Sequence, residues 1–109
     1  MMKTAVYIQK GEALNYVNNT QSKIPANTVL LLGNRLGIAG CDIEPGELGA
    51  LHVVGVFEIP KKAGETLTVG DNIAFTEEDG IVKATETVMG YVVEDAAASA
   101  LTAKVKLLG

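Results

Sequence analysis

Short apolar or alternating segments, separated by turn residues, are the feature that most restricts what this chain can fold into. No segment keeps the 3.6-residue apolar period of an amphipathic helix. Valine, isoleucine and threonine number 12, 7 and 9, and such β-branched side chains prefer the pleated strand to the helix. Twelve glycines lie between the segments and supply turns. The sequence therefore predicts an all-β fold with short hairpins, either a small β-barrel or a β-sandwich.

The expected strands follow the alternation of side chains along the chain. Residues 29–32 are wholly apolar, which indicates a strand that is covered on both faces or lies at a subunit contact. Residues 34–37 are expected to turn the chain, with a return strand from Ile38, and residues 95–101 to form one short helical turn capped by Asp95. The other expected strands are residues 5–9, 14–17, 51–59, 72–76, 81–84, 88–94 and 102–108.

One local pattern occurs twice, in residues 24–38 and again in residues 67–81, and the two copies align without a gap. Each copy reads as a turn, an apolar strand, a glycine turn and the beginning of a return strand. Asn27 aligns with Gly70, and these residue types best tolerate the positive φ of a tight corner. We interpret the repeat as a unit of sheet construction that carries shape and no chemistry.

Composition limits the class of protein. A chain of 109 residues is expected to form a single domain, residues 1–109. It has no apolar run near the roughly 20 residues that span a bilayer and no signal-peptide pattern, so we expect synthesis in the cytoplasm and no membrane partner. The net charge is −4 with scattered basic residues, which disfavours nucleic-acid binding. Cys41 is the single cysteine, so an internal disulfide is excluded.

Few residues are candidates for chemistry. Cys41 and His52 are the one conceivable nucleophile and base, but nothing in the sequence positions a third group. The favoured interpretation is that Cys41 is a small buried thiol and His52 an ordinary strand residue. The acidic run at residues 77–79 lacks the spacing of a calcium loop and reads as a solvated hairpin tip. Lys61 and Lys62 read as solvated loop residues. The sequence contains no phosphate-binding loop, and we predict no catalytic, cofactor-binding or metal-binding residue.

An ordered set of short motifs resembles one known family over nearly the whole chain. The motifs are K-T-A-V-Y-x-Q-x-G-E at residues 3–12, L-G-N-R-x-G-I-A at 32–39, D-I-x-x-G-E-x-G at 42–49, G-V-F-E-I-P-K at 55–61, and the segment from G-Y-V-V-E-D-A-A-A to K-V-K-L at 90–107. Together they are similar to the capsid cement, or decoration, proteins of tailed phages. Asn27 departs from the family pattern, which usually has glycine there.

The resemblance implies a β-tulip-like fold and a structural role in the virion. A protein of this kind binds the major capsid protein on the outside of the assembled head, stabilises the shell without catalysis, and commonly forms a homotrimer. Some relatives carry a recombinase label, but the missing phosphate loop argues against that activity here. Residues 1–7 are expected to form an N-terminal arm that pairs with an exposed edge of the capsid protein.

Two alternatives from other classes remain. One is a small β-barrel module that binds a carbohydrate or a peptide. The other is an enzyme that uses Cys41 and His52.

Overall fold

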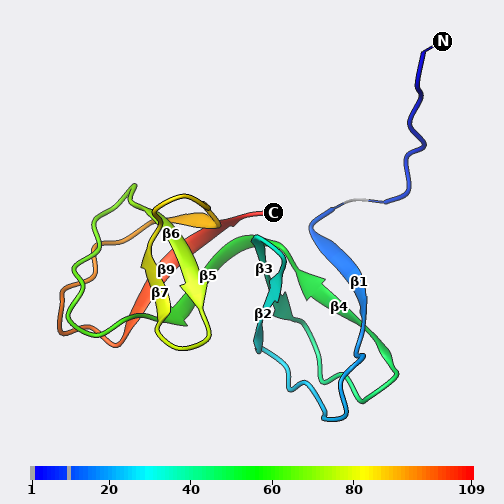
Figure 1. Cartoon of the computed structure of the whole chain (residues 1–109), viewed down its shortest axis with the longest axis horizontal. Coiled ribbons are helices and arrows are strands. Elements are labelled where there is room, and N and C mark those ends of the chain that lie inside the picture. The colour runs from blue at the N-terminus through cyan, green and yellow to red at the C-terminus, as the bar shows by residue number, and fades with distance from the viewer. Residues whose placement is uncertain (1, 10) are drawn as a thin grey trace.

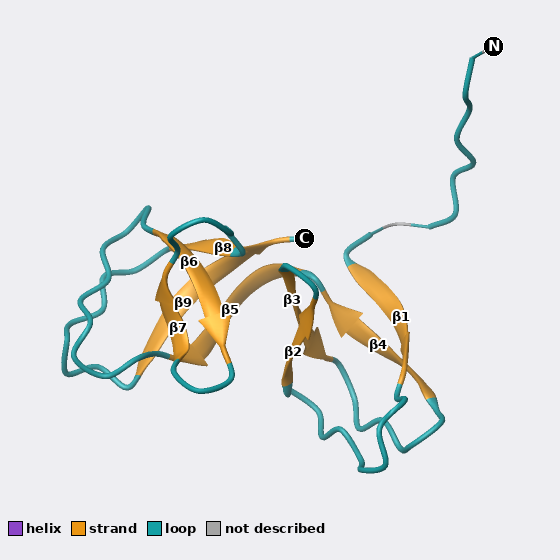
Figure 2. Cartoon of the chain, viewed as in Figure 1, coloured by secondary structure: helices purple, strands orange, loops and turns teal. Residues whose placement is uncertain are grey.

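The computed structural model describes residues 2–9 and 11–109, and in this part of the chain it is all-β without a helix (Figures 1 and 2). Nine strands form two antiparallel sheets. The strands are β1 (Ala13–Val17), β2 (Val29–Leu32), β3 (Arg35–Ala39), β4 (Leu48–His52), β5 (Val54–Pro60), β6 (Asn72–Thr76), β7 (Gly80–Lys83), β8 (Gly90–Val92) and β9 (Thr102–Leu108). The first sheet has the order β1-β4-β3-β2 and the second the order β5-β9-β8-β6-β7. The predicted fold class is confirmed.

The two sheets stay open, so of the two predicted architectures the closed barrel does not form. The first sheet ends at β1 and β2, and the second at β5 and β7. The predicted helical turn at residues 95–101 is wrong as well. The Ala100 N–H donates to the Ala97 carbonyl at 3.0 Å and closes a tight turn, because the segment bends directly from a β-bridge at Ala96 into β9.

A four-stranded unit is used twice. The order β1-β4-β3-β2 of the first sheet is repeated by β5-β9-β8-β6 in the second. The register repeats as well: Leu14 pairs with Leu51 in the first unit, and Phe57 pairs with Val105 in the second. Leu14 and Phe57 are separated in sequence by the same interval as the predicted repeat. The chain is therefore two copies of one β unit in tandem.

Matching turns lead into β2 and β6. Asn27 and Gly70 occupy the corners with φ of 72° and 93°, the left-handed region that asparagine and glycine tolerate best. The N–H of the residue after each corner donates to the carbonyl three positions earlier, at 3.2 Å in the first unit and 2.9 Å in the second. This part of the predicted repeat is confirmed at both positions.

The return strand is where the predicted repeat departs from the structure. The sequence alignment equates β3 with the strand that follows β6, which is β7. By register the equivalent of β3 is β8, because Ala39 pairs with Leu51 of β4 as Val92 pairs with Val105 of β9. Strand β7 is thus an addition to the second unit.

Two strand predictions and one turn prediction are corrected by the structure. Residues 5–9 form no strand because they have no neighbouring strand to pair with, and they extend away from both sheets (Figure 1). The long strand predicted at residues 51–59 is divided at Val53 into β4 and β5, which belong to different sheets. The turn predicted at residues 34–37 is tighter and earlier, since Leu32 already pairs with Arg35 around Gly33 and Asn34.

The core consists of two clusters of unequal size. The smaller cluster lies on the first sheet and contains Ile24, Ala39, Ile43 and Leu51. The larger cluster is built mainly on the second sheet, but Leu36 and Ile38 of β3 belong to it and are 2% and 4% exposed. Two side chains of the first sheet therefore complete the core of the second, which joins the two units into one body.

Candidate functional site

The two residues of the enzyme hypothesis lie in unremarkable surroundings. Cys41 is exposed in the segment that follows β3, so the expected buried thiol is wrong. His52 ends β4, and its ring centroid lies 6.4 Å from that of Phe57. Among the described residues no hydrogen bond joins Cys41 to His52. The structure does not assemble these two side chains into a nucleophile–base pair.

The acidic run at residues 77–79 forms the turn between β6 and β7, as predicted. The Asp79 N–H donates to the Thr76 hydroxyl at 3.0 Å, which fixes the turn locally. Within residues 2–9 and 11–109, no group of three or more His, Cys, Asp or Glu side chains is arranged to hold a metal ion. No helix in this part of the chain is both apolar enough and long enough to cross a bilayer.

Lys61 is buried, at 6% exposure, so the prediction of a solvated lysine is wrong for this residue. It occupies the place in the second unit that the fully buried Asn18 has in the first. The Lys61 ammonium donates to the Lys62 carbonyl at 2.9 Å, and the Asn18 amide donates to the Ile43 carbonyl at 2.8 Å. Both side chains thus satisfy backbone carbonyls beside a turn, which is a structural role.

Two aspartates stabilise the turns before β2 and β6 by accepting backbone hydrogen bonds. Asp42 Oδ1 accepts the Ala26 N–H at 2.8 Å, and Asp95 Oδ1 accepts the Val69 N–H at 2.8 Å. The Ala26 hydrogen bond, followed by the positive charge of Lys23, lowers the pKa of Asp42 below its ordinary value of 3.8.

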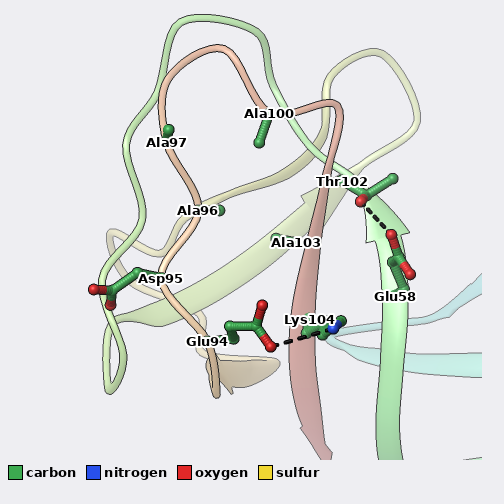
Figure 3. Close-up of a pocket in the computed structure, with 9 residues that line it drawn as sticks. All are labelled: Glu58, Glu94, Asp95, Ala96, Ala97, Ala100, Thr102, Ala103 and Lys104. Carbon is green, nitrogen blue, oxygen red and sulfur yellow. Dashed lines mark hydrogen bonds and ion pairs between the residues drawn. The ribbon is translucent and has the colours of Figure 1, made fainter.

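A hollow beside β5 and β9 is lined by charged side chains over small apolar ones (Figure 3). The Thr102 hydroxyl donates to Glu58 Oε2 at 2.6 Å, and the Lys104 ammonium lies 3.2 Å from Glu94 Oε2. These polar groups bind one another across an exposed surface, where an ion pair contributes little. This hollow was not predictable from the sequence, because its apolar lining consists of alanines, which have no distinctive functional group.

A second hollow lies between β2 and the turn that joins β6 to β7, and it has a different character. Val29, Leu30 and Phe75 supply apolar lining, whereas the acidic residues 77–79 stand along one side. Part of the lining is the apolar segment 29–32, whose assignment to a covered strand or a subunit contact was left open by the sequence. β2 is an edge strand with Leu31 40% exposed, so the first of those interpretations is wrong.

Large apolar side chains are exposed over much of the surface. Three neighbours in the N-terminal segment, Val6, Tyr7 and Ile8, are 80–81% exposed. Others lie on the sheets and turns, namely Leu14, Val17, Leu31, Leu48, Val56, Val69, Leu101 and Leu108. Among these, the three consecutive apolar side chains of the N-terminal segment are the ones that most suggest a contact with another protein.

Comparison with solved structures finds a distant neighbour among phage proteins. The neighbour is the N base of the head fiber gp8.5 in bacteriophage phi29, with 18% sequence identity and a TM-score of 0.46. The match covers 87% of this chain and 93% of that chain. No curated protein matches the sequence significantly.

Comparison with protein families finds a match along most of the chain. Residues 8–107 match the model of a family described as phage cement protein. The match spans both β units up to residue 107 and includes the motifs on which the resemblance rests, except residues 3–7 of the first motif. The chain therefore belongs to the phage cement protein family, and its role is that of a structural protein of the phage head.

Proposed function

We propose that this protein decorates the outside of an assembled phage capsid as a homotrimer, binds the major capsid protein there, and stabilises the shell without catalysing a reaction. The observation that carries the proposal is the family match over residues 8–107. The exposed apolar residues and the open sheet edges support it, since a clamp between neighbouring subunits needs apolar area and strand edges. A reactive centre is not needed for this role.

The stabilising effect arises from mass action. A protein that binds only the assembled shell lowers the free energy of that state, and many copies on one capsid add their contributions. Each interface needs only modest affinity, which agrees with a small domain. The acidic net charge of −4 also limits adsorption to the DNA that such a shell contains.

The test is reconstitution on expanded empty capsids made from the major capsid protein encoded by the same phage. We expect saturable co-sedimentation, a bound number of copies that matches the local three-fold positions of the shell, and a higher temperature of capsid disruption. Capsids before expansion are the control, because their subunit contacts differ. Absence of saturable binding, or binding that leaves the disruption temperature unchanged, would overturn the proposal.

A further inference from the structure

Strand β2 presents an unprotected apolar edge. It is the last strand of the order β1-β4-β3-β2, so among the described strands only β3 pairs with it. Its sequence, Val-Leu-Leu-Leu, contains no charge and no proline, the devices by which edge strands normally avoid pairing with other chains. Leu31 is 40% exposed on this edge strand. β2 is therefore suited to accept a further strand.

The hollow beside β2 restricts which strand would fit. Its apolar lining includes Val29, Leu30 and Phe75, and the turn at residues 77–79 places three acidic side chains along it. An extended segment with apolar side chains and at least one positive charge would complement both parts of this surface.

The N-terminal segment of the chain has this chemistry. Residues 2–9 are all exposed and form no strand, although residues 5–9 alternate as a strand does. Val6 and Ile8 are 80% and 81% exposed, and Lys3 supplies a positive charge before them. The segment leaves the first sheet from β1, at the edge opposite to β2, and extends away from both sheets (Figure 1).

We propose that residues 2–9 of one copy of the chain add as a strand to the free edge of β2 in a second copy. In that arrangement Val6 and Ile8 cover the apolar lining of the hollow, and Lys3 lies near the acidic turn. Eight extended residues span roughly 26 Å, which exceeds the roughly 13 Å length of a four-residue strand. The inference rests on the proposed self-association, and it assigns the contact to residues 2–9 of one copy and the edge of β2 in the other.

The geometry of such an exchange favours a closed ring. The donor segment and the acceptor edge are different surfaces, so the contact is heterologous, and a heterologous contact closes into a ring when the rotation between copies permits. Each copy would both donate and accept one strand. This replaces the capsid protein with a second copy of the chain as the partner of the N-terminal arm.

Site-directed cross-linking tests the contact directly. In a Cys41→Ser background, the single-cysteine variants Ile8→Cys and Leu31→Cys are mixed and oxidised, so that a mixed disulfide can form only between two molecules. We expect the mixed dimer to exceed, by several-fold, the product of a control mixture of Ile8→Cys with Val69→Cys, whose cysteine replaces a residue that is 57% exposed elsewhere. Equal yields from the two mixtures would overturn the inference.

The charge complementarity has its own test. The double variant Glu77→Lys and Glu78→Lys should reduce the mixed disulfide several-fold, whereas Glu86→Lys, an exposed charge change in the segment before β8, should not. A loss of the same size in both variants would contradict the assignment of the acidic turn.

Deletion of residues 2–9 separates this inference from the proposed function. We expect the shortened chain to remain folded by circular dichroism and to become monomeric by mass measurement. A shortened chain that still self-associates but no longer binds capsids would overturn the inference and assign the arm to the capsid protein. Conversely, a full-length chain that exchanges strands but does not bind capsids would support the inference and contradict the proposed function.

Discussion

At the scale of the single residue, Gly80 is the position that the packing restricts most clearly. Its φ is +78°, and a Cβ added there would overlap the carbonyl oxygen of Pro60. Gly33 has a similar φ of +61°, but an added Cβ would meet no atom within 4 Å. The two glycines therefore separate the cost of the left-handed backbone from the cost of a backbone clash.

We predict that Gly80→Ala destabilises the protein far more than Gly33→Ala. The backbone strain alone costs about 1–2 kcal/mol, and the clash with Pro60 should add at least about 2 kcal/mol because a carbonyl group cannot move away as a flexible side chain does. The measurement is urea denaturation of both variants, comparing midpoints at similar slopes. Equal losses in the two variants would show that the chain near Pro60 yields easily.

Asp42 should make the free energy of unfolding depend on pH. Its pKa is lowered, mainly by the Ala26 hydrogen bond and then by Lys23, so the contribution of its charge is complete above pH 3.8 and is lost as the pH falls through the lowered value. Asp42→Asn keeps an acceptor oxygen without the charge. The stability difference between the natural chain and this variant should therefore shrink below pH 3.8.

The matched control for this effect is Lys23→Met. It removes both contributions of Lys23 and leaves the Ala26 hydrogen bond, which is the largest single cause, so part of the pH dependence should persist. Denaturation series between pH 6 and pH 2 measure both variants. A difference between the natural chain and Asp42→Asn that stays constant over this range would contradict the assignment.

At the scale of the element, the two β units share one local arrangement: a residue in an isolated β-bridge precedes the turn into the next strand. Ile24 and Ile43 exchange backbone hydrogen bonds of 2.9 and 2.8 Å in the first unit, and Leu67 and Ala96 exchange bonds of the same lengths in the second. The bridge fixes the turn on one side, and the apolar side chain of the bridge residue anchors it in the core. Leu67 is fully buried in the larger cluster.

We predict that Leu67→Ala destabilises the protein by about 2–5 kcal/mol, the range for removing a buried leucine from a packed core. Leu101→Ala is the control, because that leucine is 82% exposed and surface changes usually stay within about 0.5 kcal/mol. Chemical denaturation gives both values. A small loss for Leu67→Ala would mean that the bridge holds the turn without its side chain.

Individual strands and turns could be predicted from the sequence better than the pairing between strands. Turn residues such as Asn27 and Gly70 act locally, so their corners were predictable. Pairing between distant strands is not local: residues 51–59 contain no proline and no polar turn that would end a strand, yet the chain passes from one sheet to the other at Val53. The exposure of Cys41 and the burial of Lys61 depend on the same distant packing, and therefore the candidate residues were identified while their surroundings were not.

At the scale of the whole molecule, the two β units are repeated in topology but unequal in packing. The smaller cluster on the first sheet has four buried members, and β3 also contributes Leu36 and Ile38 to the larger cluster. Two buried side chains of the first unit thus pack in the core of the second. Separation of the two units would expose Leu36 and Ile38 and leave the larger cluster incomplete, so we expect the molecule to unfold as one.

Tyrosines placed in different parts of the chain allow this expectation to be tested. Tyr16 lies in β1 of the first unit and Tyr91 in β8 of the second, and each is partly buried, whereas Tyr7 is 80% exposed in the N-terminal segment. With fluorinated tyrosine, and Tyr→Phe variants to assign the signals, urea should remove the native resonances of Tyr16 and Tyr91 at one midpoint with one slope. Tyr7 serves as the internal reference, because an exposed ring should show no comparable shift. If the Tyr16 resonance were lost at lower urea than that of Tyr91, the first unit would unfold separately, and the contribution of Leu36 and Ile38 to the second core would be too weak to couple the two sheets.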